Sequence, residues 1–226
     1  MEYRKKDSLE GSVFLNGSLI DSYIEDIAKR IHDPALHGAA SVMVGAGFSK
    51  NADVVDDELS APNWEELAVS MFEALYQKPK DEAEIKNWQI QKIKKTSGKN
   101  VLKLAEEYKS VFGQNKLNKF IEANINDDMY IPGDLHTKLL SLNWRDVFTT
   151  NYDTLLERTI DKINVKFNYQ ILTSQNDLPG STHPRIIKLH GSVDHAKHYI
   201  ICEEDYRTYL IQFAPYQQDF VVSLLG

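Results

Sequence analysis

The sequence predicts an α/β protein with a doubly wound parallel sheet and an inserted helical module. Short apolar runs, typical of strands buried in a parallel sheet, alternate with segments of helical spacing. This alternation is interrupted at residues 63–126, where only helical spacing is found. The chain has 226 residues, which is enough for one large α/β domain or a core with a sizeable insert.

The N-terminal part predicts an arm, a helix and a first strand. Residues 1–17 are polar and indicate an arm, and residues 18–32 repeat apolar side chains every three or four positions, as an amphipathic helix does. Residues 40–44 form a short apolar run without that period, which favours a strand buried on both faces. We therefore expect an N-terminal arm and helix over 1–37 and the main domain over 38–226.

The inserted module is expected to contain about four helices. Helical spacing recurs over 64–76, 81–95, 101–112 and 116–125, with Gly, Pro and Ser residues between these segments. Part of the module is rich in lysine: Lys86, Lys92, Lys94, Lys95 and Lys99. A nucleic-acid patch is one interpretation, but the interleaved acidic residues favour a solvated helix face.

The α/β pattern resumes after the insert. Strands are expected at 146–151, 167–172, 185–189 and 199–202, with a helix at 152–162 and two helical stretches from residue 203 onward. The apolar stretch 220–225 stands at the end of the sequence.

Composition argues against several functional classes. A net charge of −7 does not suit a nucleic-acid surface, and no run approaches the ~20 apolar residues that cross a bilayer. The first residues lack the apolar core of a secretory signal. Cys202 is the single cysteine, so neither an internal disulfide nor a four-cysteine zinc site can form. We expect a cytoplasmic protein without a metal, membrane contact or direct nucleic-acid contact.

The first candidate for chemistry is Gly45-Ala46-Gly47-Phe48-Ser49, directly after a predicted strand. Glycines let the backbone approach a ligand, and freed N–H groups can face a phosphate. Ser49 is placed to cap the next segment or to bond a phosphate oxygen. The third glycine of a dinucleotide fingerprint is Lys50 here, and the chain has no P-loop motif, so an ordinary strand-to-helix turn remains an alternative.

Two further motifs follow later predicted strands. Thr149-Thr150-Asn151-Tyr152-Asp153 gathers hydroxyls, an amide and a carboxylate where open α/β sheets bind ligands, although Asn151 or Asp153 could simply cap the next helix. Leu189-His190-Gly191-Ser192 places a histidine at a strand end, where it is suited to general-base chemistry near neutral pH. The alternative is a structural or merely exposed histidine. Because all three motifs follow strands of one sheet, we expect their loops to converge on one crevice.

In this order, the three motifs resemble the GAG, TxNxD and HG signatures of the sirtuin (SIR2) superfamily. The variants TTNYDTLLE (149–157) and APNWEEL (61–67) are similar to the SIR2-like effector domains of prokaryotic anti-phage defence proteins. The resemblance covers roughly residues 38–225. It implies a Rossmann-like fold that binds NAD as a substrate and cleaves its nicotinamide–ribose bond, which would deplete cellular NAD.

The resemblance also implies roles for individual residues. Asn151 would orient the attacking water or the ribose, and His190 would act on the ribose hydroxyls or as a base. Asp153 would accept a hydrogen bond from the nicotinamide carboxamide. The rest of the NAD-binding set would be Gly45, Ala46, Gly47, Phe48 and Ser49, with the pyrophosphate on the glycine loop, together with Thr150, Gly191 and Ser192.

Departures from the superfamily separate the possible activities. The four-cysteine zinc module and the Pro-Asp-Phe-Arg stretch of the deacetylases are missing, and Thr150 replaces their glutamine. NAD⁺ hydrolysis is therefore favoured over protein deacylation, and a sensor that binds NAD or ADP-ribose without turnover is the other alternative. The family sheet normally continues beyond 220–226, so we expect this chain to be the front of a longer protein. We also expect a homo-oligomer, or a complex with a sensor subunit or C-terminal domain, with subunit contacts at Tyr76, Trp88 and Tyr108.

Overall fold

A parallel sheet lies at the centre of the computed structural model, which describes residues 17–32, 40–55, 64–98, 100–162, 167–195 and 199–225. Within these residues the sheet has the order β1-β4-β6-β5, and all of its neighbouring strands are parallel. The strands are β1 (Val42–Val44), β4 (Asp146–Thr149), β5 (Gln170–Leu172) and β6 (Arg185–Lys188). The expected α/β fold with a parallel sheet is confirmed. The predicted arm lies outside the described residues, apart from Gly17.

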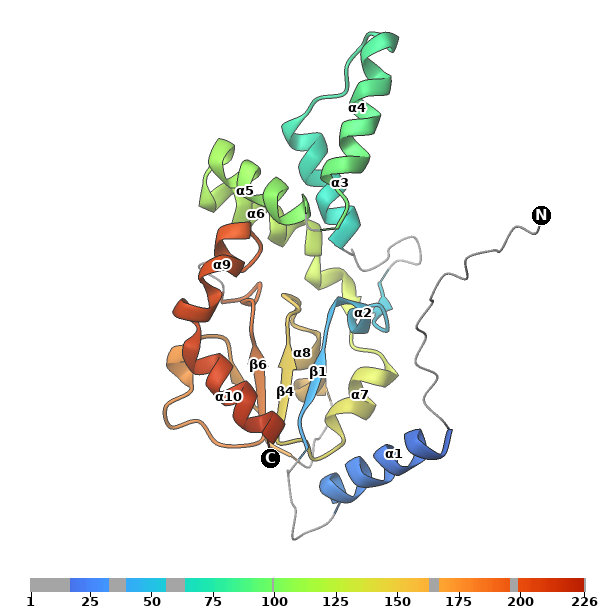
Figure 1. The fold of residues 1–226 in the computed structure, drawn as a ribbon. Helices are drawn as coiled ribbons and strands as arrows, with labels where there is room; N and C mark the ends of the chain where they lie inside the picture. Colours follow the sequence, from blue (N-terminus) through green and yellow to red (C-terminus); the bar gives the residue numbers. More distant parts are fainter. Residues whose placement is uncertain are drawn as a thin grey trace, which may run out of the picture.

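Helices cover both faces of the sheet (Figure 1). On one face, Val147 and Ile186 pack with Leu140 of α7 (Asp134–Leu140) and Leu156 of α8 (Leu155–Lys162). On the other face, their sequence neighbours Phe148 and Ile187 pack with Tyr216 of α10 (Ala214–Leu225). Since successive side chains of a strand point to opposite faces, the continuous apolar runs of β4 and β6 are explained by burial on both sides.

The first strand differs from the prediction of burial on both faces. Met43 in β1 is 52% exposed, and β1 pairs only with β4 among the described residues. Met43 belongs to none of the core clusters of the described residues, so its side of β1 is not covered, whereas Val44 on the other side is buried. The helix α1 (Gly17–His32) forms as expected and contributes Ile31 to the core near β1.

The insert consists of the helices α3 (Trp64–Leu75), α4 (Glu82–Lys95), α5 (Asn100–Phe112) and α6 (Gln114–Ile125). Its core is continuous with the sheet domain, because Leu104 and Leu117 belong to one cluster with Tyr152 and Ile201. Helix α4 has no buried residue and projects away from the sheet (Figure 1). The lysines of α4 lie on its surface, and Lys92 pairs with Glu73 at 2.7 Å. This arrangement supports the interpretation of a solvated helix face.

The prediction that aromatic residues of the module make subunit contacts is wrong for Tyr108. Tyr108 is only 8% exposed and lies in the module's own core. Tyr76 and Trp88 are partly buried against Phe72 in the same cluster. Burial removes Tyr108 from a possible subunit contact, whereas contacts at Tyr76 and Trp88 stay a prediction.

Several short elements were missed or wrongly assigned. At the base of the insert, β2 (Asp53–Val54) and β3 (Tyr130–Ile131) form an antiparallel pair too short for any periodic signal. The strand predicted at 199–202 is wrong. This segment is a buried loop whose backbone bonds elsewhere: Ile200 N donates to His190 O at 3.1 Å, and Cys202 N donates to the Asp205 carboxylate at 2.8 Å. Beyond it, α9 (Glu203–Gln212) and α10 form the two expected helical stretches.

Within the described ranges, every helix is too short or too polar to cross a bilayer.

Candidate active site

The GAGFS and TTNYD motifs meet at the carboxyl edge of the parallel sheet. Strands β1 and β4 are adjacent and in register, with Val44 opposite Thr149, so the loops that follow them emerge side by side. The first loop continues into the short helix α2 (Ala46–Ser49). In the second loop, the buried Thr149 hydroxyl accepts a 3.0 Å hydrogen bond from Asn151 N, which turns the chain back toward α2.

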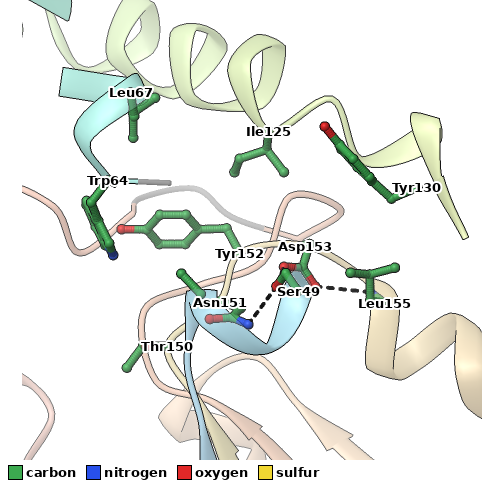
Figure 2. Close-up of a pocket in the computed structure, with 11 residues that line it drawn as sticks. Ser49, Trp64, Leu67, Ile125, Tyr130, Thr150, Asn151, Tyr152, Asp153 and Leu155 are labelled. Carbon is green, nitrogen blue, oxygen red and sulfur yellow. Dashed lines mark hydrogen bonds between the residues drawn. The ribbon is translucent and has the colours of Figure 1, made fainter. Parts of the chain in front are cut away.

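A hydrogen-bonded chain joins the two motifs through their side chains (Figure 2). The Asn151 Nδ2 group donates to Gly45 O at 3.0 Å and to Ser49 Oγ at 2.8 Å, and Ser49 Oγ donates to Asp153 Oδ2 at 2.6 Å. Because a carbonyl oxygen only accepts, the contact with Gly45 fixes which end of the amide faces α2. Asn151 Oδ1 is buried and has no hydrogen-bond partner among the described residues. That oxygen is available to a donor on a ligand.

Asp153 serves the fold and the site together. Its Oδ1 accepts from Leu155 N at 3.2 Å, at the start of α8, while its Oδ2 accepts from Ser49. The helix-capping interpretation is therefore confirmed for Asp153, and its role toward a ligand stays a prediction. A second acid, Asp127, supports the same helix end, because Thr154 N donates to its Oδ1 at 2.9 Å.

A pocket lies between these motifs and the helical module (Figure 2). Ser49, Asn151 and Asp153 form its polar side. Trp64 and Ile125 come from the helical module, which therefore forms one wall of the pocket. Apart from these, the pocket is lined by Ala46, Leu67, Tyr130, Thr150, Tyr152 and Leu155. The result is a site with an apolar wall on one side and a convergent amide, hydroxyl and carboxylate on the other.

The glycines of the first motif are not required by backbone conformation. Gly45 has φ −127°, which any residue adopts. A Cβ atom on Gly47 would meet nothing within 4 Å, so its surface is open to a ligand. The close approach lies instead at Gly133, where a Cβ would stand 2.3 Å from Asn51 O. This glycine was missed because its partner is far away in the sequence.

Phe48 does not face the pocket. Its ring packs edge-on against His136, with the ring centroids 4.8 Å apart. His136 is buried, and burial lowers the pKa of its imidazole. Phe48 thus anchors α2 to α7, and only its backbone remains available for the NAD-binding role that the sequence suggested.

The third motif lies beside the pocket without lining it. Leu189 N donates to Thr149 O at 2.8 Å, which places the LHGS loop next to the TTNYD loop. The His190 ring packs edge-on against Tyr206 and Tyr209, at 5.4 and 6.0 Å between centroids. Within the described part of the chain, His190 is absent from the pocket lining. The GAGFS and TTNYD loops therefore meet at the pocket as expected, whereas the LHGS loop lies next to them without lining it.

His190 has an unusual environment. Burial lowers the pKa of its imidazole to about 4, so the ring is neutral near pH 7. Its Nδ1 atom is buried with no hydrogen-bond partner among the described residues. A neutral ring suits a role as hydrogen-bond acceptor better than a role as base, because a group with so low a pKa holds a proton weakly at neutral pH.

The other two residues of this motif shape the loop. Gly191 has φ +96°, a left-handed conformation that favours glycine. Ser192 is fully buried and donates to Asp194 Oδ1 at 2.6 Å. In this structure Ser192 therefore supports the loop and does not reach the pocket.

The described residues contain no group of three or more His, Cys, Asp or Glu side chains that could hold a metal ion.

Comparison with known proteins gives a consistent result. Residues 145–226 match the family model of the SIR2-like domain. An NAD(+) hydrolase ThsA of Enterococcus faecium is 26% identical over 189 residues, which are 81% of this chain and 34% of that protein. Defense-associated sirtuin 2 of Bacillus subtilis is 24% identical over 195 residues, 84% of this chain and 17% of that protein.

A third relative is the NAD(+) hydrolase ThsA of Bacillus cereus (strain MSX-D12), 29% identical over 85 residues, which are 36% of this chain and 17% of that protein. The chain thus spans about a third of the length of the first relative and about a sixth of the other two. These matches confirm the resemblance drawn from the three motifs: the chain is similar to a SIR2-like domain over residues 145–226 and to proteins named NAD(+) hydrolase and defense-associated sirtuin.

Proposed function

We propose that this chain is the NAD⁺-hydrolysing part of an anti-phage defence protein, which cleaves the nicotinamide–ribose bond and depletes cellular NAD. The observation that carries this proposal is that Asn151 lines the pocket and that its buried Oδ1 has no hydrogen-bond partner among the described residues. A buried polar atom without a partner is costly, so a ligand donor is its natural complement. The printed names of two relatives, NAD(+) hydrolase, support the choice of ligand.

Each residue has a role in this proposal. Asn151 Oδ1 accepts from the attacking water or from a ribose hydroxyl, while its Nδ2 is held by Gly45 and Ser49. Asp153 receives the nicotinamide carboxamide, as the family resemblance implies. The open backbone surface at Gly47 lets the pyrophosphate come close to α2. His190, whose Nδ1 has no partner among the described residues, would accept from a ribose hydroxyl in a conformation that brings its ring to the pocket.

The bond is broken by positioning and electrostatics. The C1′–N bond breaks and its electron pair stays on nicotinamide, which leaves as a neutral ring. A water oxygen bonds to C1′ and releases its proton to the solvent. Positive charge develops on the ribose during this step, so a nearby carboxylate stabilises the transition state more than the ground state. Asp153 supplies that carboxylate. The apolar wall formed by Trp64 and Ile125 limits access of water to the departing ring.

The test is direct. The purified full-length protein is incubated with NAD, with and without phage components, and nicotinamide release is followed. We expect release by the wild-type protein and none by Asn151→Ala at an unchanged melting temperature. Full turnover by a folded Asn151→Ala variant would contradict the assignment.

One observation favours a second candidate, a module that binds NAD or ADP-ribose without turnover. His190 stands outside the pocket lining, so in this conformation the site lacks one of its two expected catalytic groups. A sensor would bind NAD with a measurable Kd while the nicotinamide–ribose bond stays intact. The same assay, combined with calorimetric NAD binding, distinguishes the two candidates.

We further infer that residues 38–226 belong to one NAD-binding unit of a longer cytoplasmic protein. Assembly, as a homo-oligomer or with a sensor subunit or C-terminal domain, would control an activity that is toxic to the cell. The expected consequence is that residues 1–226 alone turn over NAD more slowly than the triggered full-length protein. Equal rates from a monomer of residues 1–226 would contradict this inference.

A further inference from the structure

A buried ion pair lies directly behind the pocket residue Asp153. Lys188, the last residue of β6, is 1% exposed, and Glu157, in the first turn of α8, is 8% exposed. The Lys188 Nζ atom lies 2.9 Å from Glu157 Oε1. The same ammonium group donates a hydrogen bond to the main-chain carbonyl of Asp153. Neither charged residue lines the pocket itself.

Burying this ion pair lowers the free energy that stabilises the fold. Burial raises the pKa of the Glu157 carboxyl, and the attraction of Lys188 only partly opposes the shift. Burial therefore works against the ionised form of this carboxyl, and the nearby ammonium works for it. Its Oε2 atom is buried without a hydrogen-bond partner among the described residues. Since an apolar pair of similar volume is often equally or more stable, stability does not explain why a lysine and a glutamate stand here.

The geometry offers another explanation. The Asp153 side chain is fixed by Ser49 and by the backbone of Leu155. Its main chain is fixed by Lys188, which reaches across from the neighbouring strand. Together these contacts hold Asp153 at both ends.

We propose that the Lys188–Glu157 pair is a positioning device for the active site. Lys188 holds the Asp153 carbonyl, and with it the loop that carries Asn151, while Glu157 neutralises the buried ammonium. Without Glu157, an unbalanced positive charge would lie behind the site at which positive charge develops during the reaction. This role rests on the proposed NAD⁺ cleavage.

A second buried ion pair, which joins the other end of β6 to β4, provides a control. Arg185, three residues before Lys188 on β6, donates to Asp146 Oδ1 of β4 at 2.6 Å. The two residues are 4% and 0% exposed. Two of their further partners lie in α10: Arg185 donates to Asp219 and Ser223 donates to Asp146, at 2.6 and 2.8 Å. None of these four residues lines the pocket.

The experiment measures kcat and KM for NAD, together with the melting temperature, in the full-length protein. The main variant is the double substitution Lys188→Met with Glu157→Leu, which removes both charges. We expect a melting temperature near that of the wild type and a kcat at least about tenfold lower, because small misplacements of reacting groups cost this much or more. KM should change by less, since the glycine loop and the apolar wall still hold NAD. The control Arg185→Lys should lower the melting temperature and leave kcat unchanged.

The outcomes separate this role from a structural one. A folded double variant with wild-type kcat overturns the positioning role. If the double variant does not fold, Lys188→Arg is measured instead, because it keeps a cationic hydrogen-bond donor at this position. Turnover near the wild-type level then supports the positioning role. A folded Lys188→Arg variant that is as inactive as Asn151→Ala contradicts it. Absence of nicotinamide release by the wild-type protein contradicts the proposed function itself.

Discussion

The Ser49 hydroxyl donates a 2.6 Å hydrogen bond to the Asp153 carboxylate, across 104 residues of sequence. This bond joins the short helix after β1 to the loop after β4, and Asn151 donates to the same hydroxyl at 2.8 Å. Ser49 is only 8% exposed, so its hydroxyl is shielded from most solvent. The serine of the glycine-rich motif is thus the centre of the polar side of the pocket.

Replacing Ser49 by alanine should reduce turnover strongly. The change removes a hydrogen bond to a carboxylate, worth about 1.5–3 kcal/mol, and leaves Gly45 O as the remaining acceptor of the Asn151 amide. We expect kcat for NAD to fall by roughly 10- to 100-fold, consistent with that range of energies. The control is Ser110→Ala in the module, which removes a 2.8 Å bond from an exposed serine to Glu106 O and should leave kcat unchanged. Wild-type kcat in Ser49→Ala would show that the bridge is dispensable.

His190 should make stability depend on pH in the acidic range. Its pKa is lowered to about 4 in the folded chain, so the unfolded chain, with a pKa near 6.5, binds more protons between these values. The stabilisation is fully present above about pH 6.5 and is lost as the pH falls toward 4, by at most about 3 kcal/mol. Denaturant unfolding of the wild type and of His190→Gln, measured at pH 5 and pH 7, checks this.

The difference between the two proteins is the informative quantity, because burial also lowers the pKa of His136, which contributes with the same sign in both. His190→Gln should lose less stability on acidification than the wild type. An identical pH dependence in the two proteins would mean that His190 is not held neutral by the fold.

Two glycine substitutions should separate ligand approach from folding. A Cβ on Gly47 meets nothing within 4 Å, so Gly47→Ala should keep the melting temperature. It should raise KM for NAD if the pyrophosphate lies against the main chain of α2. A Cβ on Gly133 would stand 2.3 Å from Asn51 O, so Gly133→Ala should lower the melting temperature by displacing the segment after α2. Unchanged KM in Gly47→Ala would place the pyrophosphate elsewhere.

The apolar wall of the pocket should contribute to substrate binding. Trp64 lines the pocket and contacts the Tyr152 ring edge-on, with 6.0 Å between centroids. Trp64→Ala should raise KM for NAD several-fold, since apolar contact area is lost, roughly 25 cal/mol for each Å². The matched variant is Trp88→Ala in α4, which removes a 2.9 Å bond to Tyr76 O and should affect only the stability of the module. Equal KM values in both variants would exclude Trp64 from the binding surface.

The sequence by itself determined the fold class, the insert and the two motifs that form the pocket. Apolar runs and helical spacing are local properties, so β4, β6 and the four helices of the insert could be predicted within a few residues. The placement of GAGFS and TTNYD at one edge also followed from sequence, because parallel strands that end in loops bring those loops to the same side.

The tertiary structure decided which of these residues touch. The Ser49–Asp153 bond and the close approach of Gly133 to Asn51 each join segments some eighty to a hundred residues apart, and no local period encodes such pairs. The segment 199–202 has the apolar composition of a strand, yet its backbone bonds to His190 and Asp205, so no strand forms. The sequence shows that Lys188 places a charge at the end of an apolar strand. It does not show that the partners of this charge are Glu157 and the Asp153 carbonyl. Burial and hydrogen bonding between distant segments are settled only when the whole chain packs.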